Sequence, residues 1–391
     1  MSRLKIAFDF SNLHILESYL VEAYRGALLF AMENDWEVVY RDCYFGPSYS
    51  AYDALKGLGV DGVLFDYLCP KDAQKVKETG LAAVNLGGLS YDGQFAAVHQ
   101  NDERIGQLGA RHFLERFYTN LAFFGSAKEN SMKRQEGFLS IAEEAKIKVE
   151  SFEGQFSSSI YFSYTDWRGN FLNIKEFKTW LKSLAKPIGI MCHHDSLAFI
   201  LSKCCQNLGY KVPEDIAIVG VQEFPLLLDS PLKTLSCVDH NAQACGYQAA
   251  ALLDKIIKGT EKDQKQIYVS PKGVIQREST DFVAISHPAI SRAHEFIKKY
   301  FTDAITVDDV AEAAGVSRAS LNRHYRQIMK RSVANEIREY RLERASALLI
   351  DSHLNLKEIA LLCGFTDASH FSNLFVKKYG QRPGQWRIKK D

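Results

Sequence analysis

The chain has 391 residues, of which 46% are hydrophobic and 24% are charged, and its formal net charge at pH 7 is +1. This composition is typical of a globular protein with room for more than one domain, and it excludes an intrinsically disordered chain. No apolar run reaches the roughly 18 residues that span a bilayer, and the N-terminus has no signal-peptide pattern. We therefore expect a cytoplasmic protein without a membrane segment.

The charged residues are unevenly distributed along the chain. Residues 283–391 contain 18 lysines and arginines against 12 aspartates and glutamates, a net charge of +6, and the residues before them carry a net charge of −5. A basic segment of this kind can bind the phosphates of nucleic acid. We predict two domains, residues 1–282 and residues 283–391, with nucleic-acid binding in the second.

Residues 1–282 alternate short runs of β-branched and aromatic residues with amphipathic helical patterns. The predicted strands are Lys5–Phe10, Glu37–Arg41, Gly62–Phe65, Ala82–Leu86, Asn120–Gly125, Gly189–Cys192 and Ile216–Val221. The helical patterns include Leu16–Met32, Glu103–Arg116, Ser131–Glu144, Phe177–Leu184, Ser196–Leu208 and Asn241–Ile257. This alternation is typical of doubly wound parallel sheets. We expect an α/β fold of two Rossmann-like lobes, with the first five strands in one lobe and those after about Asn120 in the other.

Polar residues follow many of the predicted strands. Ligands of parallel sheets bind at the carboxyl ends of the strands, so these residues are candidates for a ligand site in a cleft between the lobes. The candidates are Asn12, Asp66, Asp102, Arg134, Trp167, His194, Asp195 and Gln222. Carboxylates, amides, an arginine and an indole ring together suit a neutral polyol, because each hydroxyl donates and accepts hydrogen bonds and a sugar ring packs on an aromatic face.

A phosphorylated or flat ligand is the alternative. The sequence has no glycine-rich loop of the dinucleotide-binding or P-loop form, which disfavours a phosphate site. Lys133 or Arg168 could nevertheless supply positive charge. A purine or a sugar phosphate therefore stays open as an alternative effector.

The sequence gives little support to catalysis or metal binding. Its eight cysteines include no Cys-x-x-Cys pair, and we expect them to be reduced core residues. The segment Cys192-His193-His194 and the pair Cys204-Cys205 have no usual zinc spacing, so we expect neither a metal nor another cofactor. A histidine beside Asp195 lacks an elbow-type serine, so we do not expect an enzyme.

The C-terminal part contains the same helix-turn-helix pattern twice. In the first copy Thr306 can cap a short helix and Gly315 turns the chain toward the next helix. In the second copy Asn355 and Glu358 have the spacing of a capping box, and Gly364 makes the turn. The two copies predict an all-α double helix-turn-helix domain.

A connecting helix is predicted between the two copies, over Val333–Ile350. Its apolar residues recur at helical spacing, and Arg338, Arg341 and Arg344 are expected to face solvent. Such a helix would hold the two recognition helices so that they enter successive major-groove segments of one duplex, roughly 34 Å apart.

This C-terminal part resembles the AraC/XylS family of transcription regulators. The resemblance rests on the tandem pattern, on Gly364-Phe365 in the second turn and on the closing segment from Tyr379 to Arg387. It implies base contacts from the two recognition helices, at Arg318, Ser320, Asn322, Arg323, Ser369, His370, Ser372 and Asn373. Arginine can fork onto guanine and asparagine onto adenine, whereas serine and histidine discriminate less between bases. Phosphate contacts are expected from Arg326, Lys377, Lys378 and Arg382.

The N-terminal part resembles the LacI/GalR and periplasmic sugar-binding family. The matching segments include Arg134-Gln-Glu-Gly-Phe, His194-Asp-Ser-Leu-Ala and the run from Val212 to Val221. The resemblance implies that Arg134 and Asp195 hold sugar hydroxyls, and that the cleft is lined near Asp102, Trp167 and Gln222. The sequence departs from the family in two ways: the usual N-terminal DNA-binding headpiece is missing, and Gln222 stands where an acidic residue is common.

A sugar-type sensing domain ahead of an AraC-type tail is similar to the xylose-responsive activators. This resemblance implies a sugar-responsive activator of pentose utilisation genes, with xylose or a related pentose as the effector. It also implies a double-stranded DNA operator and RNA polymerase as partners, and a homodimer formed through the sensing domains. The effector would close the cleft and thereby reposition the helix-turn-helix pairs.

Overall fold

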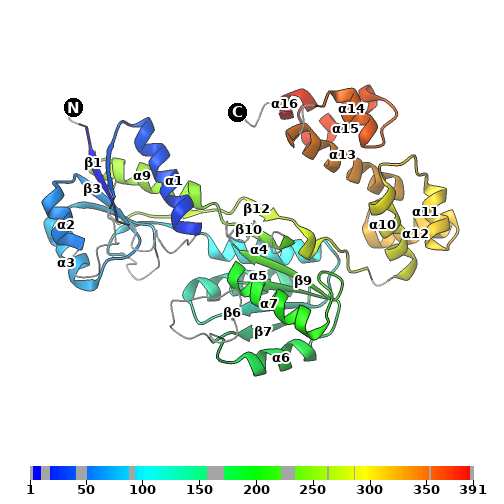
Figure 1. The fold of residues 1–391 in the computed structure, drawn as a ribbon, viewed down its shortest axis with the longest axis horizontal. Helices are drawn as coiled ribbons and strands as arrows, with labels where there is room; N and C mark the ends of the chain where they lie inside the picture. The colour runs from blue at the N-terminus through cyan, green and yellow to red at the C-terminus, as the bar shows by residue number, and fades with distance from the viewer. Residues whose placement is uncertain are drawn as a thin grey trace. The chain divides into compact units, whose positions relative to one another are not determined.

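The computed structural model describes residues 3–9, 18–40, 51–87, 93–155, 171–221, 234–261, 264–285, 287–351 and 354–387. Backbone contacts divide the chain into two compact units, Met1–Phe282 and Val283–Asp391 (Figure 1). The first unit contains two α/β lobes, and the described part of the second consists of helices and their connections. Among the described residues, no helix is both long and apolar enough to cross a membrane.

The first lobe is built on a six-stranded sheet in the order β11-β5-β4-β3-β1-β2, in which all neighbouring strands are parallel. Its strands are β1 Lys5–Asp9, β2 Glu37–Tyr40, β3 Gly62–Phe65, β4 Ala82–Asn85, β5 Ala96–Gln100 and β11 Gln266–Val269. Successive side chains of a strand point to opposite faces, so Ile6 and Phe8 belong to one core cluster and Ala7 to another. Both faces of the sheet are therefore buried, as a parallel sheet requires.

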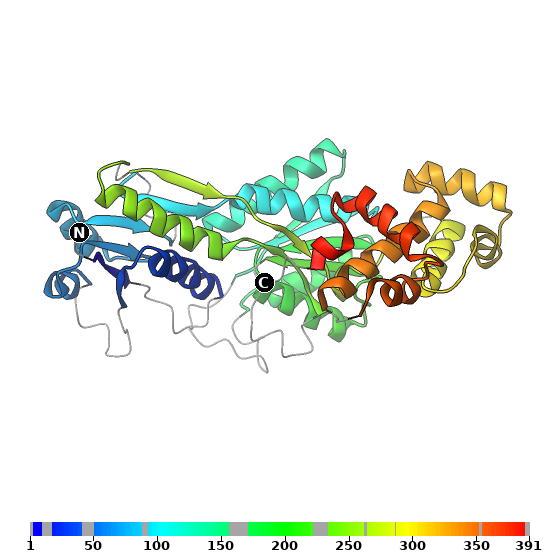
Figure 2. The same cartoon turned by 90° about the horizontal axis from the view of Figure 1, so that it is seen from above.

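Among the described elements, four helices cover this first sheet. Helices α1 (Ser18–Glu33) and α9 (Ala242–Ile257) lie side by side (Figures 1 and 2) and supply side chains to the cluster of Ile6 and Phe8. Helices α2 (Ala51–Leu58) and α3 (Pro70–Thr79) contribute to the cluster on the other face.

The second lobe is built on a sheet in the order β12-β10-β9-β8-β6-β7, which is parallel except that β12 runs antiparallel to β10. Its strands are β6 Leu121–Gly125, β7 Val149–Glu153, β8 Ile188–Cys192, β9 Ile216–Val221, β10 Ser236–Asp239 and β12 Gly273–Ile275. The two predicted Rossmann-like lobes are confirmed. The assignment of the first five predicted strands to one lobe is wrong, because the fifth, now β6, lies in the second sheet. The first sheet instead contains β5 and β11, whose sequences gave weaker strand patterns.

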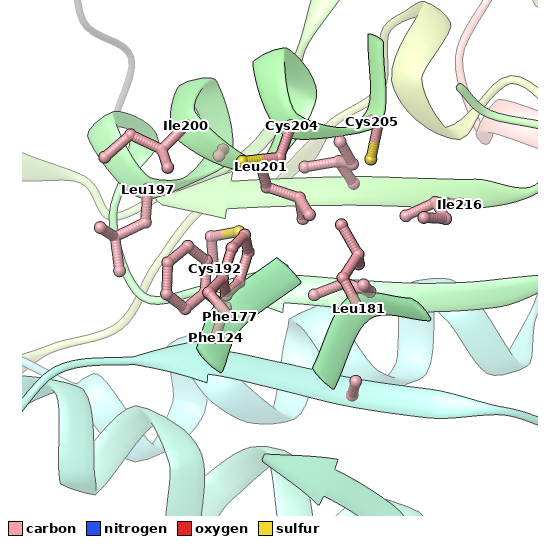
Figure 3. Close-up of a cluster of buried hydrophobic side chains, with 14 of the residues drawn as sticks. Phe124, Phe177, Leu181, Cys192, Leu197, Ile200, Leu201, Cys204, Cys205 and Ile216 are labelled. Carbon is pink, nitrogen blue, oxygen red and sulfur yellow. The ribbon is translucent and has the colours of Figure 1, made fainter. Parts of the chain in front are cut away.

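The core of the second lobe lies between its sheet and its helices. The helices are α4 Asp102–Leu114, α5 Glu129–Glu144, α6 Ile174–Ser183 and α7 Asp195–Leu208. Phe124 of β6 stacks on Phe177 of α6 with ring centroids 4.4 Å apart. Cys192, Cys204 and Cys205 are buried among these apolar side chains (Figure 3). Burial raises the pKa of the Cys204 thiol to about 11, so it is a neutral core group.

The chain passes between the two sheets three times. It leaves β5 at Gln100 and enters α4 at Asp102, it leaves β10 and enters α9, and it leaves β11 and enters β12. The crossing segments are held together by hydrogen bonds from the Asn101 amide to the Val269 carbonyl, 2.9 Å, and from the Lys272 amide to the Asp239 carbonyl, 2.9 Å. Residues at these crossings therefore lie where the two lobes join.

The second unit contains both predicted helix-turn-helix pairs. The first pair is α11 (Val307–Ala314) and α12 (Arg318–Met329), and the second is α14 (Leu356–Leu362) and α15 (Ala368–Tyr379), with α13 (Val333–Asp351) between them. Gly315 and Gly364 adopt left-handed conformations at the turns, with φ of 67° and 77°. The predicted capping box of Asn355 and Glu358 is present, as is one at Thr306. Two further helices, α10 (Pro288–Tyr300) and α16 (Pro383–Arg387), were not predicted.

The connecting helix is less one-sided than its sequence predicts. Residues on several faces are buried, among them the carboxylate of Glu336. Arg341 does not face solvent, because it is half-buried and its guanidinium donates to the carbonyls of Phe301 and Asp303. The prediction for this arginine is therefore wrong: α13 contacts both helix-turn-helix pairs, so it has no single solvent face along its length.

Candidate effector site and DNA-binding surface

Arg134 of α5 joins segments from both lobes. It is buried, with 3% of its surface exposed. Its Nε donates to Asp102 Oδ1 at 2.7 Å, its Nη2 donates to Gln100 Oε1 at 3.1 Å, and its Nη1 donates to the His193 carbonyl oxygen. Gln100 ends β5 of the first sheet, and His193 follows β8 of the second. The structure thus places the predicted residues Arg134 and Asp102 in contact and adds Gln100 and His193.

His194 and Asp195 lie at the start of α7. The Nδ1 of His194 accepts from the Ser196 amide at 3.2 Å and so caps the helix. Asp195 is buried, and its Oδ1 lies so close to Gly220 of β9 that a Cβ at this glycine would overlap it. His194 also contributes to the lowered pKa of His193, so the two predicted residues lie near the Arg134 cluster.

His240 is a further polar residue at a crossing between the lobes. It follows β10, it is 5% exposed, and neither of its ring nitrogens has a hydrogen-bond partner among the residues that the structure describes. Its ring centroid lies 5.6 Å from that of Tyr19, whose hydroxyl donates to the Leu86 carbonyl at 2.9 Å. Burial, together with the positive charge of Arg134, lowers the pKa of His240 to about 3. At neutral pH this ring is uncharged and has one donor and one acceptor.

His193 has a similar character. Burial lowers the pKa of this side chain well below its ordinary value, and its Nδ1 has no partner within the described ranges. Its Nε2 lies 3.5 Å from the Ser126 hydroxyl. None of the residues that the structure describes therefore orients this ring through Nδ1, as the third member of a catalytic triad would.

Of the remaining predicted ligand residues, only Asp66 belongs to the described part of the chain. Asp66 is buried at the end of β3, and its amide donates to the Asp9 carbonyl at the end of β1 at 3.4 Å. Asn12, Trp167 and Gln222 lie outside the described residues, as does Arg168. Lys133, the other candidate for binding a phosphate, forms an ion pair with Glu129 one turn away at 3.1 Å.

The described basic groups of this site carry little free positive charge. The Arg134 guanidinium is paired with the Asp102 carboxylate, and the two buried histidines are neutral. As far as the described residues go, the site therefore offers oriented donors and acceptors without a spare positive charge, which suits hydroxyl groups better than a phosphate. Sequence reasoning missed Gln100, His193 and His240, although each ends or follows a buried run and could have been found by that signal.

The predicted DNA-contacting residues are placed on α12, on α15 and just after them. Exposed side chains on these elements include Arg323, Arg326, Ser369, His370, Asn373, Lys377 and Arg382, whereas Ser320, Asn322 and Ser372 are half-buried. Arg318 is exposed and pairs with Asp308 of α11 at 2.8 Å. The Ser372 hydroxyl donates to the Ala368 carbonyl at 2.8 Å. Most of the predicted side chains are thus available to a ligand on the surface of this unit.

Lys378 differs from the other basic residues. Its ammonium contacts Glu339 at 2.6 Å and Glu343 at 3.1 Å, both on α13. These carboxylates raise the pKa of Lys378 against the opposing effect of burial. Because two carboxylates already bind its ammonium, Lys378 is less available to a DNA phosphate than its exposed neighbour Lys377.

Comparisons with known proteins match both units. Residues 110–280 match the periplasmic binding protein-like domain, and residues 310–389 match a helix-turn-helix domain. The chain is 24% identical to the xylose operon regulatory protein of Haemophilus influenzae, with 98% of each chain covered. It is 26% identical to that of Escherichia coli, over 93% of this chain and 91% of the relative.

A solved structure has the same fold over the whole length. The structure of the xylose-binding transcription activator XylR is similar to this chain with a TM-score of 0.60 and 23% identity, covering 100% of this chain and 99% of that one. The resemblance inferred from the sequence is confirmed for both parts. The chain is therefore a DNA-binding transcription regulator in which a periplasmic binding protein-like domain precedes a double helix-turn-helix domain, and it is similar over most of its length to xylose operon regulatory proteins.

Proposed function

We propose that the effector is a sugar, xylose or a related pentose, and that the regulator activates genes for its use. The observation that carries this proposal is the buried Arg134, which contacts residues that end strands of both sheets. A guanidinium has five N–H donors, and the three bonds made here leave two for ligand hydroxyls. The names of the relatives, both xylose operon regulatory proteins, support the same class of effector.

The proposed ligand contacts are Asn12, Asp66, Asp102, Arg134, Trp167, His194, Asp195 and Gln222, with Gln100, His193 and His240 added. A neutral sugar would supply hydrogen-bond partners to the ring nitrogens of His193 and His240 that have none among the described residues, and a buried polar atom gains free energy from such a partner. A sugar phosphate is disfavoured because Arg134 is already paired with Asp102 and Lys133 with Glu129.

The regulatory step in this proposal is a shift between open and closed forms of the sensing domain. A sugar that prefers the closed form tenfold supplies about 1.4 kcal/mol, and a nearly complete switch needs about 5.5 kcal/mol. Closure in a homodimer would change the relation between the two DNA-binding domains and hence their fit to the operator. We place this activity in the cytoplasm, with RNA polymerase as the partner of activation and no catalytic reaction.

The DNA contacts are proposed on the two recognition helices. Base contacts come from Arg318, Ser320, Asn322, Arg323, Ser369, His370, Ser372 and Asn373, and phosphate contacts from Arg326, Lys377, Lys378 and Arg382. Of these basic residues, Lys378 should contribute least, because Glu339 and Glu343 already hold its ammonium.

The test is a titration of the purified full chain with pentoses, hexoses, a pentose phosphate and a purine, followed by tryptophan fluorescence and melting temperature. We expect one free pentose to raise the melting temperature in proportion to RT ln(1 + [L]/Kd). A response to the phosphate or the purine alone would overturn the proposed effector class while leaving the regulator intact.

Arg134→Met tests the site in the same assay. Removing the hydrogen bonds of Arg134 should abolish the pentose response, whereas Lys133→Met on the same helix should not change it. Sugar binding that survives in Arg134→Met would show that the site lies elsewhere.

A further inference from the structure

The two helix-turn-helix pairs meet at the connection between α10 and α11. Arg341 of α13 donates through Nε to the Phe301 carbonyl at 2.6 Å and through Nη2 to the Asp303 carbonyl at 2.7 Å. These carbonyls follow the C-terminal end of α10, where helix carbonyls lack partners within the helix. One half-buried guanidinium thus ties the connecting helix to the first pair by two charge-assisted bonds.

The turn of the second pair rests on the same connection. Gly364 has a φ of 77°, and a Cβ placed on it would lie 2.7 Å from the Thr302 carbonyl oxygen and 2.9 Å from Arg341 Nε. No larger residue fits there without moving the two backbones apart. A pocket of about 290 Å³ adjoins this contact, and its lining includes Val307 of the first pair, Arg338 of α13, and Phe365 and His370 of the second pair.

The connecting helix has polar anchors to both pairs. Glu336, 2% exposed, pairs with Arg331 just after the first recognition helix at 2.5 Å, and Glu339 and Glu343 hold Lys378 of the second. A helix of this length, roughly 27 Å, could set the distance between the pairs but would not stop either from pivoting on its end. The contacts of Arg341 and Gly364 remove that freedom.

We propose that Arg341 is a positioning residue for DNA recognition: together with Gly364 it locks the two helix-turn-helix pairs and so sets the spacing between the two DNA segments that one chain accepts. The inference rests on the proposed DNA contacts of the two recognition helices. One inserted base pair moves the second segment by about 3.4 Å and turns it around the duplex by about a tenth of a turn. A locked pair of recognition helices cannot follow this change, and an unlocked pair can.

The test selects binders from random 40-base-pair duplexes with the full-length protein and reads the spacing between the two selected motifs. For the wild type we expect one spacing, and a loss of affinity of about tenfold or more when one base pair is inserted. For Arg341→Met and Gly364→Ala we expect several spacings, and an insertion penalty of about threefold or less.

Arg344→Met is the matched control, because it removes the same charge from an exposed position of the same helix. It should keep the single spacing of the wild type. Arg341→Lys retains the charge but offers one ammonium to two carbonyls, so the affinity that it loses on insertion of one base pair should be intermediate. If Arg341→Met does not fold, Arg341→Lys provides the test of the inference.

Two results would overturn the inference in different ways. If the folded Arg341 variants select the wild-type spacing with the wild-type penalty and lose affinity for all duplexes equally, then Arg341 serves stability alone. If the wild type enriches no paired motif, the proposed DNA contacts of both recognition helices fail, and the inference fails with them.

Discussion

At the scale of single residues, a neutral histidine suits a hydroxyl-rich ligand because its ring carries one donor and one acceptor. His240 is buried at a lobe crossing with neither nitrogen partnered among the described residues. Phenylalanine keeps the ring shape and removes both polar atoms. We expect His240→Phe to melt at the same or a higher temperature without effector and to bind the pentose about tenfold more weakly.

His112 provides a matched control for this prediction. It is also a buried histidine, but its Nε2 is 2.9 Å from the Thr280 hydroxyl. His112→Phe should lower stability, because it removes the buried hydrogen bond between His112 and Thr280, and should leave sugar affinity unchanged. Isothermal titration and thermal melts separate the two patterns, and unchanged affinity in His240→Phe would remove this residue from the site.

Glu336 gives the DNA-binding unit a dependence on pH. Burial raises the pKa of Glu336 to about 7 from an ordinary value near 4.5. The folded state therefore binds the proton of the Glu336 carboxyl more tightly than the unfolded state does. The stability that this protonation confers is fully present below about pH 4.5 and is lost as the pH rises through about 7. Glu336→Gln resembles the protonated acid and lacks this loss.

The measurement compares the unfolding free energy of the wild type and Glu336→Gln by urea denaturation at pH 6 and pH 8. Between pH 6 and pH 8, the unfolding free energy of the wild type should fall by about 1 kcal/mol relative to that of Glu336→Gln. The lowered pKa of the adjacent His294 acts in the opposite direction, but it is present in both proteins and largely cancels in the difference. A difference that is constant with pH would show that Glu336 is ionised throughout.

At the scale of elements, the crossing of α4 and α5 depends on two glycines. A Cβ on Gly137 of α5 would overlap the Glu103 carbonyl oxygen of α4, and a Cβ on Gly106 of α4 would overlap the Arg134 carbonyl oxygen of α5. The glycines let the two backbones touch, and these helices carry Asp102 and Arg134. The close crossing therefore supports the proposed effector site directly.

Gly137→Ala should force these helices apart. We expect a loss of about 2–4 kcal/mol in unfolding free energy and a weaker effector response. Gly57→Ala in α2 is the control, since a Cβ there meets nothing within 4 Å, and it should stabilise the protein by about 0.5–1 kcal/mol. A Gly137→Ala protein with wild-type stability and response would contradict the close packing.

The elements also show what the sequence could predict. Strands such as Ile216–Val221 are continuous apolar runs, and the helix-turn-helix pairs have caps and turn glycines at fixed spacing, so local patterns were sufficient for them. Ala96–Gln100 was missed because its run of small residues ends in His99 and Gln100. Local sequence does not encode which sheet a strand joins, and for that reason Leu121–Gly125 was placed in the wrong lobe.

The candidate effector site was also predictable only in part from the sequence. Asp102 and Arg134 were named together because each lies at or near the start of a helix that follows a strand, and the structure places them in contact. His240 was missed because its segment lies at the second passage between lobes, which depends on long-range topology. Arg341 was misjudged because helical periodicity assumes one buried face, whereas α13 contacts both helix-turn-helix pairs.

At the scale of the whole molecule, the two units carry net charges of opposite sign. The residues from Val283 carry a net charge of +6 and those before them a net charge of −5. Because phosphate contacts dominate the salt dependence of DNA binding, the slope of log K against log salt should be a property of the second unit. The acidic first unit can only weaken non-specific attraction to DNA, unless its effector or its dimerisation intervenes.

A fragment of residues 283–391 tests this separation of roles. We expect it to bind random-sequence duplex more tightly than the full chain at low salt, with a similar salt slope and no response to the pentose. Fluorescence anisotropy of a labelled duplex across a salt series gives both quantities, and circular dichroism melts establish that the fragment is folded. If the folded fragment binds no duplex at any salt concentration, then DNA binding requires the sensing unit, and the dimer formed through it becomes the species that recognises DNA.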